Sequence, residues 1–261
     1  TERKELDLIN NMSKSPYGIV IVVGPTGSGK STTLYSMLSA LNKPGVNIST
    51  VEDPVEYTLD GIHQVQVIRE KGLDFSRALR SLMRQDPDII LVGETRDKET
   101  AQAAMEAALT GHMVFTTLHA NDTATAITRL AEMEIPPYLI GASIIGVVAQ
   151  RLVRKVCKGC SELRKLNSKE HHLARGLGVE KARFLSKNNK SCSICNGSGY
   201  KGRVGIYEVM KVNEVVRELI MNQANADEIR ERAFDKSGRT LLSYGMTLVK
   251  EELTTIEEVE R

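Results

Sequence analysis

The sequence contains no tryptophan, few aromatic residues (4%) and almost no excess of charge of either sign. Its 35 lysines and arginines nearly balance 33 aspartates and glutamates, which leaves a formal charge of +2. Proteins that hold nucleic acid without sequence preference rely on basic surfaces and on stacking of bases against aromatic rings. The composition therefore argues against a nucleic-acid motor, and we expect no nucleic-acid partner.

Long apolar runs are missing too. The two longest, residues 18–24 and 139–149, are well short of the ~20 residues that a helix needs to cross a bilayer. The first residues carry no apolar core of the signal-peptide kind. We therefore expect a cytoplasmic protein without inserted segments, which reaches a membrane through partners. Because the sequence starts at Thr1 rather than Met, we also expect an upstream region.

The chain does contain enough apolar material for a core, since 41% of its 261 residues are hydrophobic. Short apolar strands alternate with helical patterns. This alternation predicts an α/β fold, with a mainly parallel sheet covered on both faces. The predicted strands are 18–23, 47–52, 64–67, 88–92 and 113–118, and the predicted helices are 32–42, 74–85, 97–111, 121–133 and 136–152.

The composition changes at residue 151. The segment that follows is basic and rich in glycine, contains all four cysteines and has few large apolar residues, so it needs a staple to fold. We expect three parts: an α/β domain at 1–150, a tetracysteine metal-binding subdomain at 151–203, and a small, mostly helical C-terminal subdomain at 204–261.

Residues 24–32, GPTGSGKST, fit the phosphate-loop pattern. The predicted strand before them and helix after them argue against a chance glycine-rich turn. Glycines let successive backbone N–H groups face phosphate oxygens, and the helix N-terminus adds its positive end. Lys30 would bring charge to the β- and γ-phosphates, and the Ser31 hydroxyl would bind Mg²⁺. The predicted nucleotide contacts are Gly24, Pro25, Thr26, Gly27, Ser28, Gly29, Lys30, Ser31 and Thr32.

An apolar strand runs into Glu94 in the stretch DIILVGETRD, residues 88–97. Phosphate-loop proteins place an acid at such a strand end to hold the Mg²⁺ shell. Here Gly93 occupies the usual aspartate position, so Glu94 would reach metal-bound water or the attacking water. The alternative is an ordinary exposed glutamate after a buried strand.

A second acidic segment, TVEDPVEY at residues 50–57, also follows a predicted strand. A carboxylate there can orient or deprotonate the water that attacks the γ-phosphate. Glu52, Asp53 and Glu56 are the candidates, and we favour Glu56. The alternative is a solvated acidic turn shaped by Pro54.

A histidine and several arginines complete the candidate site. His119 ends an apolar strand in TTLHAND, where open α/β sheets place ligands, although a structural histidine is the alternative. Arg80 and Arg84 are four residues apart on one predicted helix face. Guanidinium groups can stabilise transition-state charge across a subunit boundary, whereas most surface arginines are only solvated. Further arginines available for this role are Arg77, Arg96 and Arg129.

The cysteines form two CxxC pairs, on either side of residues 161–191. Two such pairs can present four thiolates to Zn²⁺ in a tetrahedron, a closed site whose role is structural. Disulfides are disfavoured in a cytosolic protein, and a redox site needs only one pair. We predict zinc bound by Cys157, Cys160, Cys192 and Cys195, with His171 and His172 at the surface.

The motifs GPTGSGKST, VEDPVEY, RQDPDIILVGETRD, TTLHAND and the paired CxxC before GYKGRVGIYEV occur in this order. The order resembles the secretion ATPase superfamily, specifically the type II secretion and type IV pilus assembly ATPases. The resemblance extends from about Ser15 to the C-terminus. It implies a RecA-like phosphate-loop NTPase core, a Mg²⁺-dependent ATPase, a homohexamer, and partners in an inner-membrane secretion or pilus machine.

The resemblance also assigns positions. Residues 24–32 match the family's Walker A loop, and Glu52, Asp53 and Glu56 fall in its Asp box. Gly93 and Glu94 match an atypical Walker B motif, and Thr117 and His119 fall in the His box. The cysteines match the metal-binding subdomain of assembly-type members, and we expect the family's upstream domain to lie outside this sequence. The arginines that the family tends to use around the nucleotide and the subunit boundary correspond to Arg80, Arg84, Arg96, Arg129 and Arg203.

The expected function is therefore an ATP-driven motor subunit that powers secretion or assembly of pilins or pseudopilins. Two alternatives remain at this point: a RecA-like nucleic-acid translocase, and a zinc-stapled adaptor that binds ATP without turnover.

Overall fold

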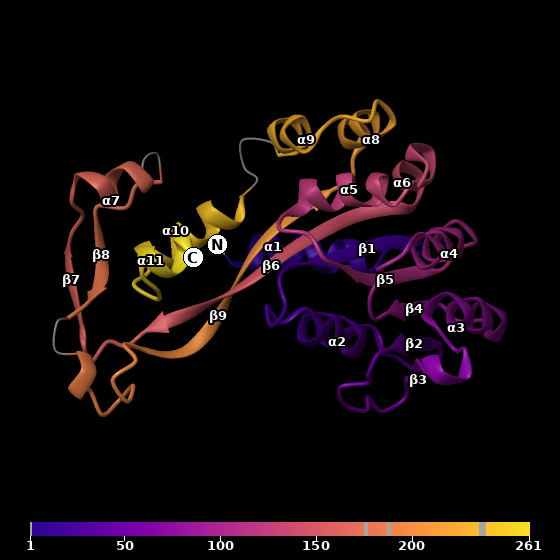
Figure 1. The fold of residues 1–261 in the computed structure, drawn as a ribbon, viewed down its shortest axis with the longest axis horizontal. Coiled ribbons are helices and arrows are strands. Elements are labelled where there is room, and N and C mark those ends of the chain that lie inside the picture. Colours follow the sequence, from indigo (N-terminus) through magenta and orange to yellow (C-terminus); the bar gives the residue numbers. More distant parts are fainter. Residues whose placement is uncertain (1, 175–176, 187–188, 235–238) are drawn as a thin grey trace. The chain divides into compact units, whose positions relative to one another are not determined.

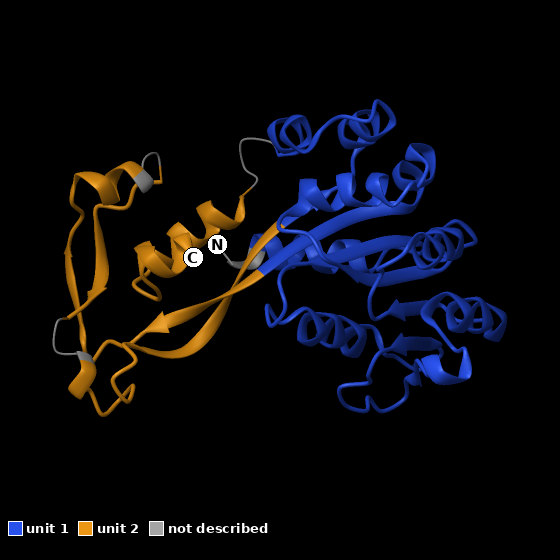
Figure 2. Cartoon of the chain, in the orientation of Figure 1, with its two compact units in different colours: residues 1–150, 209–238 blue, residues 151–208, 239–261 orange. Residues whose placement is uncertain are grey.

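A computed structural model describes residues 2–174, 177–186, 189–234 and 239–261. The chain forms two compact units (Figure 2). Unit 1 contains residues 1–150 and 209–238, and unit 2 contains residues 151–208 and 239–261. The three-part division expected from the sequence stays a prediction. The compact units differ from it, because residues 204–261 are shared between both.

Unit 1 is built around a seven-stranded sheet with the strand order β3-β2-β4-β5-β1-β6-β9 (Figure 1). The strands are β1 (Gly18–Val23), β2 (Ile48–Glu52), β3 (His63–Gln66), β4 (Ile89–Val92), β5 (Met113–Leu118), β6 (Ile144–Val156) and β9 (Tyr200–Lys211). The last two strands extend into unit 2. All pairings from β3 to β6 are parallel, which confirms the predicted α/β class with a parallel sheet.

The helices of unit 1 are α1 (Glu2–Ser13), α2 (Lys30–Leu41), α3 (Phe75–Leu82), α4 (Lys98–Leu109), α5 (Thr123–Glu132), α6 (Pro137–Ser143), α8 (Glu214–Met221) and α9 (Ala226–Ala233), with short 3-10 turns η1 (Arg69–Lys71) and η2 (Met83–Gln85). α1 packs on α2, whereas α3, α4, α6 and α5 pack in series. Right-handed crossovers place these two groups on opposite faces of the sheet, because the chain moves from β1 to β2 in one direction and from β4 to β6 in the other.

Aspartates begin three of these helices. Asp74, Asp97 and Asp122 each accept a hydrogen bond from the backbone N–H three residues later, at 2.8 Å. Each satisfies one of the donors that a helix leaves free at its N-terminus. These caps fix where α3, α4 and α5 start, and α4 and α5 begin directly after the segments that hold Glu94 and His119.

The predicted helix over 136–152 is wrong in its second half. α6 ends at Ser143, and Ile144–Val156 is the strand β6, paired in parallel with β1. β-branched residues at 144, 145, 147 and 148 favour a strand. In the first half of β6, side chains on both faces of the sheet are almost all buried, so this half shows none of the alternation that identifies a surface strand.

Unit 2 contains the antiparallel pair β7 (Ser161–Lys165) and β8 (Lys181–Leu185), the helices α7 (Ser168–Leu173), α10 (Leu241–Lys250) and α11 (Ile256–Glu260), and the turn η3 (Asn189–Ser191). The cysteine-rich segment builds its core with help from the C-terminus. Leu166, Val179 and Phe184 are buried together with Met246, Val249 and Ile256. The segment therefore has apolar support besides its cysteines.

Within the described residues, we find no helix with both the length and the apolar character required of a transmembrane span.

Candidate functional site

The phosphate loop joins the end of β1 to the start of α2. Gly24, Gly27 and Gly29 have φ angles of +149°, +78° and +87°, a region in which a side chain would be strained. A Cβ atom on Gly24 would lie 2.2 Å from the backbone oxygen of Gln150, so only glycine fits there. A Cβ atom on Gly27 would meet nothing within 4 Å. The loop is therefore packed against the sheet at its start and open at its centre, as a phosphate cradle requires.

Lys30 folds back over this loop. Its Nζ donates to the carbonyl oxygens of Gly24 at 2.9 Å and Pro25 at 3.1 Å. Partial burial lowers the pKa of Lys30, and the nearby Glu94 carboxylate opposes that shift. Ser31 and Thr32 are exposed at the first turn of α2. The ammonium group and the hydroxyls thus lie on the loop and at its helix end, where the sequence predicts phosphate and Mg²⁺ contacts.

Glu94 lies directly beyond β4, and its side chain is 15% exposed. One carboxylate oxygen lies 2.7 Å from His119 Nε2, and the other forms an ion pair with Arg96. Burial by itself raises the pKa of Glu94, but Arg96 and His119 outweigh burial and lower it below its ordinary value. Glu94 is therefore held in its ionised form, next to a histidine that the sequence placed at another strand end.

The segment that carries Glu94 is fixed to β5 by three hydrogen bonds. The Thr95 N–H donates to Thr117 O at 2.9 Å, and the Thr117 hydroxyl donates to Gly93 O at 2.8 Å. The hydroxyls of Thr95 and Thr116 are 2.8 Å apart. A Cβ atom on Gly93 would lie 3.2 Å from Val51 O, which leaves little room for a side chain. Glycine at the usual aspartate position thus permits β2 and β4 to approach closely.

The second acidic segment divides into a buried and an exposed part. Glu52 is 4% exposed, and its carboxylate accepts hydrogen bonds from Tyr35, Thr50 and Gln64. These donors give Glu52 a structural role. Glu56 is exposed, and its backbone N–H donates to the Tyr35 hydroxyl at 3.3 Å.

Asp53 is exposed and pairs with Arg69 at 2.9 Å. Contacts among the described residues thus bring together Glu94, Arg96 and His119, and Glu94 is near enough to influence the charge of Lys30. A hydrogen bond to Tyr35 connects Glu56 to α2.

No contact between described residues joins the other candidate arginines to this group. Arg80 on α3 and Arg84 in η2 are exposed, and no ion pair to a described residue involves either. Arg77 donates to Gly72 O at 3.3 Å, and Arg129 pairs with Glu132 one turn along α5. Arg203 is exposed in unit 2. Among these candidate arginines, Arg96 is the one that pairs with Glu94.

Two further contacts around the site were not predicted. Gln150, at the end of the unit 1 part of β6, bridges the phosphate loop and α2, donating to Ser28 O and accepting from Thr33. Arg230 on α9 pairs with Asp122, the α5 cap that follows His119, at 2.8 Å. A polar residue inside a buried strand is a usable signal for Gln150, but the apolar pattern of this segment predicts a helix.

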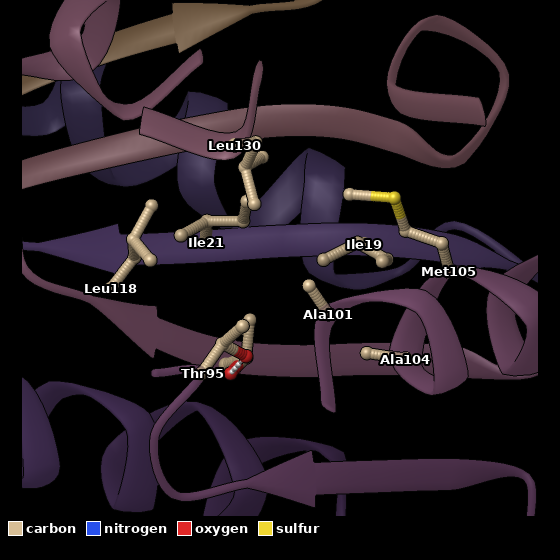
Figure 3. Close-up of a pocket in the computed structure, with 9 residues that line it drawn as sticks. Ile19, Ile21, Thr95, Ala101, Ala104, Met105, Leu118 and Leu130 are labelled. Carbon is tan, nitrogen blue, oxygen red and sulfur yellow. Dashed lines mark hydrogen bonds between the residues drawn. The ribbon is translucent and has the colours of Figure 1, made fainter. Parts of the chain in front are cut away.

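A small cavity of about 10 Å³ lies against the middle of the sheet, among residues of β1, β5, α4 and α5 (Figure 3). It is bordered by Ile19, Ile21, Met105, Leu118 and Leu130, with Thr95 at one side. Its volume is close to that of a single water molecule, so it is a packing gap in the core.

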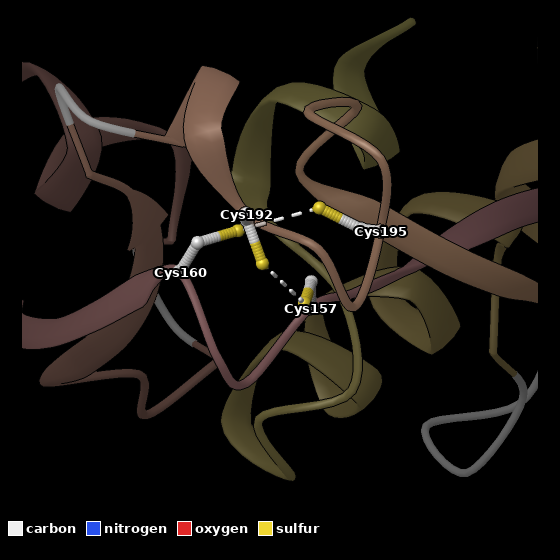
Figure 4. A group of neighbouring side chains, drawn as sticks. All are labelled: Cys157, Cys160, Cys192 and Cys195. Carbon is white, nitrogen blue, oxygen red and sulfur yellow. Dashed lines mark hydrogen bonds between the residues drawn. The ribbon is translucent and has the colours of Figure 1, made fainter.

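The four cysteines form the candidate metal centre of unit 2 (Figure 4). All four Sγ atoms lie within 4.8 Å of one another, with Cys157 and Cys192 3.9 Å apart and Cys160 and Cys195 3.6 Å apart. Zn–S bonds of about 2.3 Å in a tetrahedron imply sulfur separations of about 3.8 Å, so the donor set fits Zn²⁺. All four are free thiols, and His171 and His172 are exposed on α7.

One thiol of this cluster is also stabilised as a thiolate. Burial raises the pKa of Cys195, but the Gly199 N–H, which donates to its sulfur at 3.2 Å, and the neighbouring cysteines lower it to about 6. A thiolate is the form that binds a metal.

Comparisons with known proteins confirm the resemblance. A family model described as Type II/IV secretion system protein matches residues 1–261. The type IV pilus assembly ATPase PilB of Thermus thermophilus is 48% identical over 94% of this chain and 27% of its own length. The type II secretion system protein E of Pseudomonas aeruginosa is 45% identical over 99% of this chain and 51% of its own length. The chain thus spans from about a quarter to about a half of these two relatives.

Solved structures agree with the fold. The pilus retraction motor PilT with bound ADP superposes with a TM-score of 0.72 and 29% identity, over 97% of this chain and 63% of that chain. The ATPase DotB of Legionella pneumophila gives a TM-score of 0.70 and 25% identity, over 97% of this chain and 62% of that chain. Because the family model matches every residue of the sequence, this chain belongs to the type II/IV secretion system protein family.

Proposed function

We propose that this chain is the ATP-hydrolysing region of a motor that powers protein secretion or pilus assembly at the bacterial inner membrane. The observation that carries the proposal is the meeting of an open phosphate loop, Lys30 and the ion-paired Glu94 at the carboxyl ends of parallel strands. The names of its relatives, which are pilus assembly ATPases and type II secretion proteins, support the same class.

In the proposed mechanism, loop N–H groups and Lys30 bind the β- and γ-phosphates. Ser31 and water held by Glu94 would bind Mg²⁺, which neutralises charge that develops on the phosphate oxygens. Glu94 is a poor proton acceptor, because its pKa is lowered. The exposed Glu56 therefore prepares the attacking water, and His119 senses the γ-phosphate through its contact with Glu94.

We propose a homohexamer that binds inner-membrane partners of the secretion or pilus machine from the cytoplasmic side. Arg80 and Arg84 support this arrangement, since they are exposed and have no ion-pair partner among the described residues of the chain. Arginines of this kind can reach the nucleotide of a neighbouring subunit. We further propose a structural Zn²⁺ at Cys157, Cys160, Cys192 and Cys195.

The test measures ATP binding and phosphate release by the complete, assembled protein with and without Mg²⁺. Wild type should bind and hydrolyse ATP only with Mg²⁺, and Lys30→Ala should lose binding. Glu56→Gln and Glu94→Gln should bind ATP but release phosphate at least about 100-fold more slowly, the usual effect of losing a group that acts on the reacting water. Glu99→Gln, which changes an exposed carboxylate at the start of α4, is the matched control and should behave as wild type.

Other outcomes would overturn parts of the proposal. ATP that stays bound to wild type without phosphate release would indicate an adaptor. Turnover that single-stranded DNA stimulates at low salt but not at high salt would indicate a nucleic-acid motor. Near-normal turnover by Glu56→Gln would transfer the water-preparing role to Glu94.

A further inference from the structure

Gln150 is a buried polar residue beside the phosphate loop, and only 3% of it is exposed. Its Nε2 donates to Ser28 O at 2.7 Å, and its Oε1 accepts from the Thr33 hydroxyl at 2.7 Å. A carbonyl oxygen can only accept, so the NH₂ group must face Ser28 and the amide oxygen must face Thr33. Both ends of a buried amide are thus paired, which offsets the cost of removing it from water.

The backbone of Gln150 contacts the same loop. Its carbonyl oxygen occupies the space that a side chain on Gly24 would need, 2.2 Å from the position of a Cβ atom. One residue of β6 therefore contacts the phosphate loop at Gly24, near its end at Ser28, and in the first turn of α2 at Thr33.

The other side-chain tie across the loop comes from Lys30, which donates to Gly24 O and Pro25 O. A bound phosphate would compete for this ammonium group, because Lys30 is the residue that a phosphate loop offers to the β- and γ-phosphates. Gln150 binds the loop from the buried side, so its hydrogen bonds do not compete with a ligand. The hydrogen bonds of Gln150 therefore persist when a nucleotide binds.

We infer that Gln150 is a positioning residue: its amide holds the glycine-rich phosphate loop in the shape that binds a nucleoside polyphosphate. The inference rests on the proposed nucleotide site. A loop with three glycines at positive φ has many conformations, and each must be excluded when phosphate binds. A loop held in its bound shape avoids that cost, so Gln150 strengthens nucleotide binding without contacting the ligand.

The test compares Gln150→Met, which keeps size and shape but removes both hydrogen bonds, with wild type. Unpairing Ser28 O should raise the dissociation constants of ATP and ADP alike by about tenfold. The turnover number at saturating ATP should stay within about twofold of wild type, because the reacting groups are unchanged. Gln150→Glu accepts from Thr33 but cannot donate to Ser28 O, so it should bind no better than Gln150→Met.

Thr33→Val tests the contact without changing Gln150. It should raise the dissociation constants of ATP and ADP by about threefold, since the lost bond is to a hydroxyl that is only partly buried. Ser143→Ala is the control for general destabilisation. It removes a buried hydrogen bond of 2.7 Å to Leu139 O in the same unit, and its nucleotide affinity should equal that of wild type.

Wild-type affinity in Gln150→Met or Gln150→Glu would overturn the inference, as would an equal loss in Ser143→Ala. If wild type itself binds neither ATP nor ADP, the proposed nucleotide site is wrong, and this result is distinct from a failure of the Gln150 inference alone.

Discussion

His119 Nε2 lies 2.7 Å from Glu94 Oε1, although the two residues follow different strands, β5 and β4. Arg96 pairs with the second oxygen of the same carboxylate. Each oxygen of Glu94 thus faces one basic group. A carboxylate held in this way is a weak base, and its chemistry is to fix the orientation of water or metal ligands rather than to remove a proton.

Arg96→Gln should move the acid limb of the pH–rate profile to higher pH. Arg96 is the main group that lowers the pKa of Glu94, so its removal lets that pKa rise toward its ordinary value of 4.5. Glu94 then takes up a proton at a higher pH, and activity is lost earlier on acidification. Arg129→Gln, which removes an exposed arginine paired with Glu132, should leave the limb in place. An unchanged limb in Arg96→Gln would show that ionised Glu94 does not set the acid side of the profile.

Gly93→Ala should destabilise unit 1 by about 1–3 kcal/mol, the usual cost of forcing a methyl group into a packed position. The added Cβ atom would lie 3.2 Å from Val51 O and 3.3 Å from Glu52 Cα. Denaturant unfolding measures the change. Gly141→Ala is the matched control, because its Cβ atom meets only Ile220 Cγ2 at 3.9 Å and it lies within α6. Gly141→Ala should stabilise the protein by about 0.5–1 kcal/mol. Destabilisation in both variants would contradict the packing argument.

Asp122→Asn should lower the free energy of unfolding at neutral pH by about 1 kcal/mol or less, the range of partly exposed ion pairs. Asparagine keeps the cap to Thr125 N–H but loses the charge that pairs with Arg230. A double-mutant cycle with Arg230→Gln isolates the pair. Arg232→Gln, an exposed arginine on the same helix, is the control for Arg230.

The same pair predicts a dependence on pH. Burial raises the pKa of Asp122, but the Thr125 N–H and Arg230 outweigh it and lower the pKa below 3.8. The stabilisation is therefore complete above the unfolded value and is lost as pH falls through the lower folded value. The difference between wild type and Asp122→Asn should disappear in that acid range, and a difference that persists there would exclude the ion pair as its source.

The tetracysteine site should bind one zinc ion per chain, with four sulfur ligands at about 2.3 Å by X-ray absorption. Cys192→Ser should lose most of the metal and lower the melting temperature, because binding energy at a structural zinc site is folding energy. Ser193→Ala changes an exposed neighbour in the same turn and should keep both the bound metal and the wild-type melting temperature. Full stability after chelation would show that apolar packing on α10 and α11 suffices for unit 2.

The local parts of this fold and site follow from sequence patterns. The strands at 18–23 and 113–118 are found with the predicted bounds, because short apolar runs between helices identify parallel strands. The phosphate loop and the cysteine pairs are recognised by spacing alone. The sequence predicts a helix where the strand at 144–156 begins, since a strand covered on both faces has the same continuous apolar pattern as a buried helix.

The contacts that join distant segments could not be predicted. Gln150 meets Ser28, and Arg230 meets Asp122, across more than 100 positions of sequence. Such pairs depend on the order of strands in the sheet and on which helix returns beside it. A polar residue within an apolar run shows that a partner must exist, but the strand order decides which one.

Unit 1 is interrupted by the larger part of unit 2, because residues 151–208 separate its two segments. A ribosome that synthesises this chain must therefore release all of β7, α7 and β8 before α8 and α9 emerge. Until then Asp122 lacks Arg230, and the helices α5 and α6 lack their neighbours α9 and α8. Unit 1 can be completed only after residues 209–238 have left the ribosome, and during that interval the side of α5 and α6 that they later cover is open to chaperones.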